Sequence, residues 1–115
     1  MRIIIAGSRT IHKFDIADAV KRSGFDITTL INGRCPTGID KLASDWAKSV
    51  GIPIEYYPAN FKELGKKGGP LRNKEMAKLA FGLILVWDGH SKGSKSMKEE
   101  AEKAKLFIYE IITTN

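Results

Sequence analysis

Four glycine-bearing turns recur along this chain. They are Gly7-Ser8-Arg9, Asn32-Gly33-Arg34 through Gly38-Ile39-Asp40, Gly69-Pro70-Leu71-Arg72-Asn73, and Asp88-Gly89 through Gly93-Ser94-Lys95. Each turn follows an apolar run and leads toward a helical pattern. In a parallel α/β sheet such turns converge on the edge where the strands end, and free backbone N–H groups at helix N-termini attract anions there.

Cationic side chains fall in or beside these turns. They are Arg9, Arg34, Arg72, Lys92 and Lys95. A guanidinium can bind a phosphate group through two parallel hydrogen bonds, so these five are the candidates for holding an anion. The lysines between residues 98 and 105 alternate with glutamates at helical spacing instead, which is typical of a solvated helix face.

Local explanations compete with ligand binding at two turns. Thr37 and Asp40 have the spacing of a capping box, which alone would explain both residues. Arg72 and Asn73 are predicted in the first turn of a helix, where a cation opposes the helix dipole and a bound anion would relieve the conflict. The alternative is an arginine that extends to solvent. Cys35 also precedes a helix, but no histidine is close in sequence to act as its base.

Length and composition limit the function further. The 115 residues predict a single domain over 1–115. One cysteine and two histidines leave no disulfide and no zinc spacing, so we expect no metal, and no cofactor is indicated. No apolar stretch approaches the roughly 20 residues of a membrane span, which favours a cytoplasmic protein without a membrane partner. The net charge of +6 favours a polyanionic partner, whether nucleotide, nucleic acid or acidic protein.

The apolar pattern predicts alternating strands and helices. We expect strands at 2–6, 28–31, 54–57, 83–87 and 106–113, and helices at 15–23, 39–50, about 70–80, and 96–105, the last capped by Ser96 and Glu99. Short connections between such elements force right-handed crossovers. The predicted fold is therefore α/β, a Rossmann-like three-layer sandwich with a five-stranded, mainly parallel sheet and helices on both faces. Trp46, Phe81, Phe107 and Tyr109 are expected in the core, and Tyr56, Tyr57, Phe61 and Trp87 near the binding edge.

Taken together in this order, the four turns resemble the signature of the SLOG superfamily. The resemblance includes Met76 and Met97, spans nearly the whole chain, and points to the small YspA-type, YpsA-related branch. It implies a Rossmann-like domain that binds nucleotides or nucleotide-derived ligands, often as a homodimer or higher homo-oligomer. Several members of the superfamily are thought to sense such ligands in conflict between bacteria and phages.

The chain is also distantly similar to the Lonely Guy phosphoribohydrolases, which cleave the N-glycosidic bond of nucleoside monophosphates. Their arginine is matched by Arg72, but their Pro-Gly-Gly-x-Gly-Thr-x-x-Glu loop is matched only loosely by residues 91–97, where Met97 stands in place of the glutamate. Glycosidic cleavage needs a carboxylate to stabilise positive charge or activate water. Asp40, Glu75 or Asp88 would have to replace it. Asn32 also departs from the glycine usual at that position.

Three functional hypotheses follow. The first is a sensor or sequestering module for a nucleotide-type ligand, with a site made of Gly7, Ser8, Arg9, Gly33, Thr37, Gly38, Asp40, Arg72, Asn73, Asp88, Gly93, Ser94 and Lys95. The second is a nucleotide N-glycosidic hydrolase or transferase, with Arg72, Asp40 and Asp88 as candidate catalytic residues. The third is single-stranded nucleic-acid binding, which usually needs aromatic stacking platforms beside a basic groove.

Overall fold

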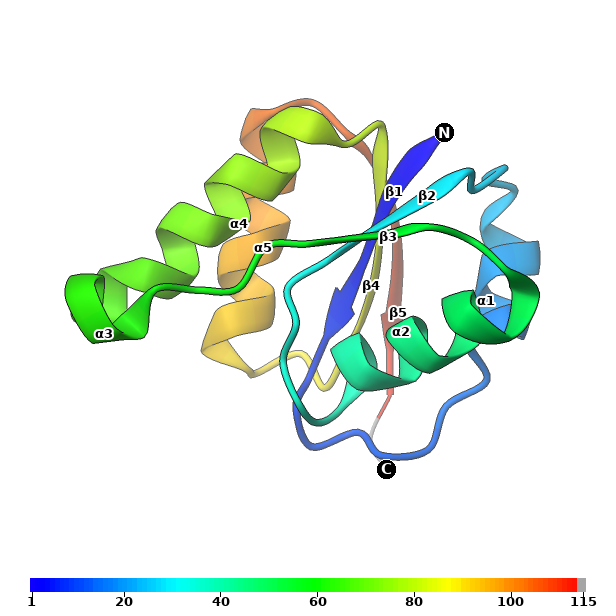
Figure 1. The fold of residues 1–115 in the computed structure, drawn as a ribbon, viewed down its shortest axis with the longest axis horizontal. Coiled ribbons are helices and arrows are strands. Elements are labelled where there is room, and N and C mark those ends of the chain that lie inside the picture. The colour runs from blue at the N-terminus through cyan, green and yellow to red at the C-terminus, as the bar shows by residue number, and fades with distance from the viewer. Residues whose placement is uncertain (114–115) are drawn as a thin grey trace.

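Five parallel strands form one sheet in a computed structural model that describes residues 1–113 (Figure 1). The strand order is β3-β2-β1-β4-β5, and every neighbouring pair is parallel. The strands are β1 (Arg2–Gly7), β2 (Thr29–Asn32), β3 (Ile54–Tyr56), β4 (Gly82–Trp87) and β5 (Phe107–Ile112). The predicted Rossmann-like α/β fold is confirmed.

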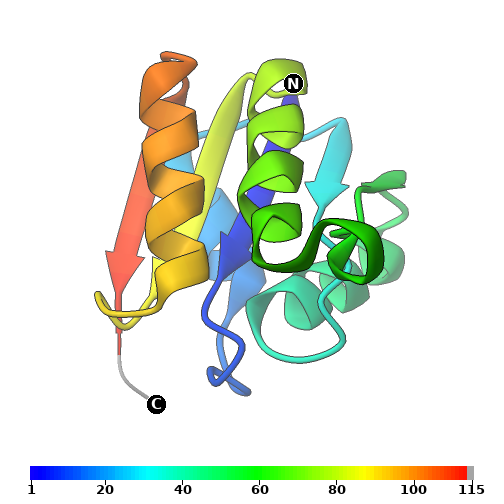
Figure 2. The ribbon, with the colours of Figure 1, turned by 90° about the vertical axis from the view of Figure 1, so that its left-hand side faces the viewer.

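Helices cover both faces of the sheet. On one face lie α1 (Ile16–Ser23) and α2 (Ile39–Val50), and on the other lie α4 (Gly68–Leu79) and α5 (Lys92–Lys103). Figure 2 shows α4 and α5 side by side across the sheet. The short helix α3 (Phe61–Leu64) and a 3-10 turn (Gly65–Lys67) lie in the connection between β3 and α4. Within residues 1–113 no helix has the length and apolar character needed to cross a membrane.

The central strand is buried on both faces, as its continuous β-branched run predicts. Ile3 and Ile5 belong to the apolar cluster under α1 and α2, whereas Ile4 and Ala6 belong to the cluster under α4 and α5. Successive strand residues point to opposite faces, so one short run anchors both helical layers. The end of β1 at Gly7 is therefore held in place from both sides.

The predicted side-chain cap of α2 is wrong. Its N-cap is Gly38, with φ +76°, and no side chain caps the helix, while Thr37 is exposed. The N–H of Ile39 donates to the carbonyl oxygen of Ser8 at 3.2 Å instead. A Cβ on Gly38 would lie 2.4 Å from that same oxygen. The chain enters α2 by crossing the β1 turn at a distance that only glycine permits, and the turn's backbone takes over the role of the cap.

The predicted starts of α4 and α5 are also wrong. Helix α4 begins at Gly68, so Pro70 is its third residue and Arg72 lies in its second turn. Helix α5 begins at Lys92, four residues earlier than expected, because the carboxylate of Asp88 accepts the N–H groups of His90 and Ser91 and turns the chain into the helix. The stretch from Gly93 to Ser96 is thus helical, and Ser96 does not cap α5.

Two aromatic residues expected in the core lie on the surface. Phe81 and Phe107 are 45% and 64% exposed and stack with ring centroids 5.1 Å apart, and Phe25 meets Phe81 edge-on at 6.4 Å. They lie at the amino ends of β4 and β5, opposite the glycine turns. Trp87, expected near the binding edge, is buried in the core and only 6% exposed.

Candidate functional site

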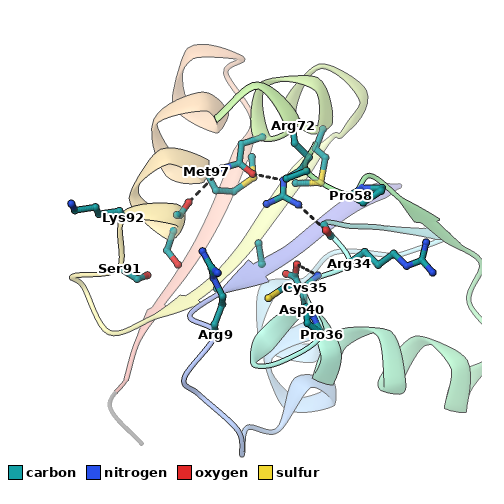
Figure 3. Close-up of a pocket in the computed structure, with 18 of the residues that line it drawn as sticks. Arg9, Arg34, Cys35, Pro36, Asp40, Pro58, Arg72, Ser91, Lys92 and Met97 are labelled. Carbon is teal, nitrogen blue, oxygen red and sulfur yellow. Dashed lines mark hydrogen bonds between the residues drawn. The ribbon is translucent and has the colours of Figure 1, made fainter. Parts of the chain in front are cut away.

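A pocket of about 630 Å³, called here the edge pocket, lies at the carboxyl ends of the central strands (Figure 3). Segments from all four glycine turns line it. Nine predicted site residues are among the lining residues, namely Gly7, Arg9, Gly33, Asp40, Arg72, Asn73, Asp88, Gly93 and Ser94. In Figure 3, Arg9 and Arg72 extend into the hollow from opposite sides, beside Asp40 and Cys35.

Four predicted site residues do not line the edge pocket, and each has a different place. Ser8 is 1% exposed, and its hydroxyl accepts the N–H of Asp88 at 3.2 Å, so it joins the first turn to the fourth from within. Gly38 forms the close crossing between α2 and the first turn. Thr37 and Lys95 are exposed to solvent.

Arg72 connects three elements at this edge. Its Nη1 donates to the carbonyl oxygens of Gly33 at 2.7 Å and Tyr57 at 3.3 Å, and its Nε donates to Oδ1 of Asn73 at 2.9 Å. Burial lowers the pKa of Arg72, and the nearby carboxylate of Asp40 opposes that effect. Arg72 therefore uses several of its N–H donors to hold the ends of β2 and β3 against α4. This is a different role from an arginine that extends to solvent.

Asp40 is a buried carboxyl on the same side of the edge pocket. Burial raises its pKa above the ordinary value, although the N–H of Cys35, which donates to its Oδ2 at 3.1 Å, and the charges of Arg72 and Arg9 work in the other direction. A carboxyl group with a raised pKa that faces a cavity can accept hydrogen bonds when ionised and donate one when protonated. Its side chain is 8% exposed in total.

The opposite wall of the edge pocket is the N-terminus of α5. Ser94 is only 4% exposed, and its hydroxyl has no hydrogen-bond partner. No side chain caps this helix end, and the first N–H groups of an α-helix have no acceptor within the helix. Asn73 ties the wall to α4, because its Nδ2 donates to Oγ of Ser96 at 3.1 Å. Lys92 points away from the hollow in Figure 3. This wall therefore offers unused donors to the cavity.

Sequence reasoning missed part of the lining. Pro58 and Ala59 come just after β3, with Tyr57 between, and line the edge pocket. The rule that ligands lie beyond the carboxyl ends of parallel strands could have found them, but no glycine marks that turn. Met76 lies one helical turn after Arg72 and so shares its face of α4. Met97, 2% exposed, occupies the wall where the Lonely Guy glutamate would stand. Of the described lining residues, Asp40 and Asp88 carry the carboxylates.

The comparisons with known proteins identify the family of this chain. The YspA, cpYpsA-related SLOG family matches residues 1–63, which is more than half of the chain. This chain belongs to that family. The Gene 61 protein of Mycobacterium phage D29 is 31% identical over 116 residues, an alignment that covers 91% of each chain. No solved structure matches at a significant level. Membership of the SLOG family is consistent with binding of a nucleotide-related ligand.

Among residues 1–113 no group of three or more histidine, cysteine, aspartate or glutamate side chains is placed to hold a metal ion. The groups that line the edge pocket include guanidinium groups, a helix N-terminus, hydroxyls, the thiol of Cys35 and two carboxylates.

Proposed function

We propose that this SLOG-family protein binds a nucleotide or nucleotide-derived phosphate ligand in the edge pocket, as a sensor or sequestering module. The observation that carries the proposal is the buried, unpartnered hydroxyl of Ser94 on the pocket wall. A buried polar group without a partner costs about 1–3 kcal/mol, and a ligand oxygen that accepts from it would recover that cost. The uncapped N-terminus of α5 surrounds it with backbone donors suited to phosphate.

The rest of the edge pocket suits the other parts of a nucleotide. Arg9 extends into the hollow and supplies a cationic group for the phosphate. The carboxylate of Asp40 is placed to accept hydrogen bonds from ribose hydroxyls. Apolar side chains of Met76, Met97 and Phe61 line the pocket and suit a base. Its volume of about 630 Å³ lies within the range of small-molecule sites and is far larger than a lone phosphate requires.

Calorimetric titration with AMP and with adenosine tests the proposal. We expect AMP to bind at least about tenfold more tightly than adenosine, because the phosphate gains charge-assisted hydrogen bonds. Ser94→Ala and Arg9→Ala should each weaken AMP binding by about tenfold and leave adenosine unaffected. Lys95→Ala and Ser49→Ala, which alter exposed residues outside the pocket, are the matched controls. Equal affinities for AMP and adenosine, or no binding across AMP, GMP, CMP and UMP, would refute the proposal.

Asp40 supports a second candidate, hydrolysis of the N-glycosidic bond of a nucleoside monophosphate. A buried carboxyl with a raised pKa beside Arg72 is the kind of group that activates water or protonates a leaving base. In that reaction water adds to C1′ of the ribose while the bond to the base breaks and the base takes up a proton. Chromatography should then detect free base, and Asp40→Asn should abolish its release while AMP still binds. No release from any of the four monophosphates would remove this candidate.

The assembly is proposed to be a homodimer or larger homo-oligomer. Native mass spectrometry of the purified protein measures the assembly and any co-purifying ligand in one spectrum. We expect a mass of at least two chains, and a bound mass that disappears in the Arg9→Ala variant. A strictly monomeric spectrum would contradict the proposed assembly without affecting the proposed site.

A further inference from the structure

A second hollow, called here the side pocket, lies against the edge pocket. Its lining comes from α2 and the ends of β2 and β3, and its volume is also about 630 Å³. Residues 34–36 and Asp40 line both hollows, so this short segment stands between them. In Figure 3, Arg34 points away from the space that Arg9 and Arg72 enter. The side pocket is therefore a separate hollow that shares one stretch of wall with the edge pocket.

The segment between the two hollows is held in an unfavourable conformation. Arg34 has φ +58°, in the left-handed region that non-glycine residues seldom adopt. Asn32 enforces it, because its buried side chain accepts the Arg34 N–H at 2.6 Å and donates to the Asp40 carbonyl at 2.9 Å. Strained backbone of this kind persists where the surrounding structure requires a side chain in one place.

That conformation places a guanidinium over an aromatic ring. The guanidinium carbon of Arg34 lies 5.6 Å from the ring centroid of Tyr56, and the Tyr56 hydroxyl is 2.9 Å from Oγ of Ser44 on α2. Both groups remain accessible to a ligand, since Tyr56 is 38% exposed and Arg34 is exposed. Both groups are surfaces on which nucleobases stack.

We propose that the side pocket binds the second base of a dinucleotide whose first phosphate occupies the edge pocket. This inference rests on the proposed function. The basic groups Lys41 and Lys48 also line the side pocket and suit a ligand with a second phosphate, although Lys41 already pairs with Asp45. Among the described residues that line the side pocket, Tyr56 alone is aromatic, so the side pocket offers a stacking surface for one base. The stacked Phe81 and Phe107 lie at the other end of the sheet, so a dinucleotide is favoured over a longer strand.

Titrations with AMP, the 5′-phosphorylated dinucleotide pApA and the hexanucleotide (pA)6 test the inference. Stacking of one additional base should make pApA bind at least about fivefold more tightly than AMP. Tyr56→Leu should remove this advantage without changing AMP affinity, whereas Tyr56→Phe, which keeps the ring, should retain it. Arg34→Asn, which tolerates the left-handed backbone, should also weaken pApA binding. Phe107→Leu, at an exposed aromatic residue far from both hollows, is the control.

The outcomes separate the two proposals. Equal binding of AMP and pApA, or an equal loss of both in Tyr56→Leu, overturns the side-pocket inference and leaves the nucleotide site standing. Failure of both ligands to bind overturns the proposed function as well. Affinity that continues to rise from pApA to (pA)6 and falls steeply with salt would identify a single-stranded nucleic acid as the ligand and refute the dinucleotide.

Discussion

The two walls of the edge pocket use their polar groups in opposite ways. On the wall made by α4, the end of β2 and the start of α2, Arg72 makes three hydrogen bonds within the protein, and Asp40 accepts one from Cys35. On the wall made by α5, the Ser94 hydroxyl has no partner and no side chain caps the helix. The first wall is already satisfied by the fold, whereas the second is left incomplete.

This contrast separates residues that shape the pocket from residues that await a ligand. Substitutions on the satisfied wall should lower stability, because they leave buried partners without hydrogen bonds. Removal of an unpartnered group from the incomplete wall should leave stability unchanged or raise it while it lowers affinity. Measurements of unfolding and of binding on the same variants can therefore test the comparison directly.

Removal of the Arg72 side chain is expected to have the largest effect. Arg72→Ala should lower the free energy of unfolding by about 3 kcal/mol, since the Gly33 and Tyr57 carbonyls and the Asn73 side chain each lose a charged donor. Urea unfolding followed by circular dichroism measures the change. Arg22→Ala, an exposed arginine on α1, should have little effect. A similarly small loss at Arg72 would show that this wall is not held by its guanidinium.

A methyl group at Gly33 should disturb the same wall less. Its Cβ would lie 2.6 Å from Nη1 of Arg72 and 2.9 Å from Oδ2 of Asp40, so both side chains would have to shift. Because the nearest atoms end flexible side chains, Gly33→Ala should cost about 1–2 kcal/mol. Gly93→Ala is the contrasting variant, since its Cβ would meet open space in a helix and should stabilise the fold by about 0.5–1 kcal/mol. Equal changes in the free energy of unfolding for Gly33→Ala and Gly93→Ala would argue against the difference between the two walls.

Ser94→Ala should raise stability slightly, by up to about 1 kcal/mol, because it removes a buried hydroxyl that has no partner. Ser96→Ala, whose hydroxyl accepts from Asn73, should lower stability by about 1 kcal/mol instead. The two serines lie two residues apart on α5, so thermal unfolding of both variants is a matched comparison. A loss of stability at Ser94 would mean that its hydroxyl is already satisfied.

The change with pH at Asp40 is expected to be the smallest effect. The pKa of Asp40 is raised in the folded protein, chiefly by burial, so the folded state retains the proton at a pH where the unfolded chain has lost it. The stability of the protein should therefore fall as pH rises from the unfolded value of about 3.8 through the raised value. The Asp40→Asn variant should not show this decline, so its free energy of unfolding should increase relative to that of the unsubstituted protein as pH rises. A difference between the two that is constant from pH 3 to pH 7 would contradict this interpretation.

Much of the fold follows from local patterns in the sequence. The β-branched run after Met1 predicts a strand buried on both faces, and the apolar spacing from Ile39 to Val50 predicts α2 with the bounds that the structure has. Parallel order then follows from short alternating elements. The same reasoning brings the glycine turns to one edge, which is why nine predicted residues line a common pocket.

Tertiary contacts decided what local patterns could not. The capping prediction failed at Thr37 because the carbonyl of Ser8, far away in the sequence, accepts the first N–H of α2. It failed at Ser96 because Asp88 accepts the N–H groups of His90 and Ser91 and α5 begins earlier than expected. Their apolar character predicts Phe81 and Phe107 in the core, but they lie at the amino ends of β4 and β5, where both rings are exposed. Whether a polar side chain is satisfied depends on atoms far away in the sequence. Only the tertiary structure therefore distinguishes Arg72, whose guanidinium is hydrogen-bonded within the protein, from Ser94, whose hydroxyl has no partner.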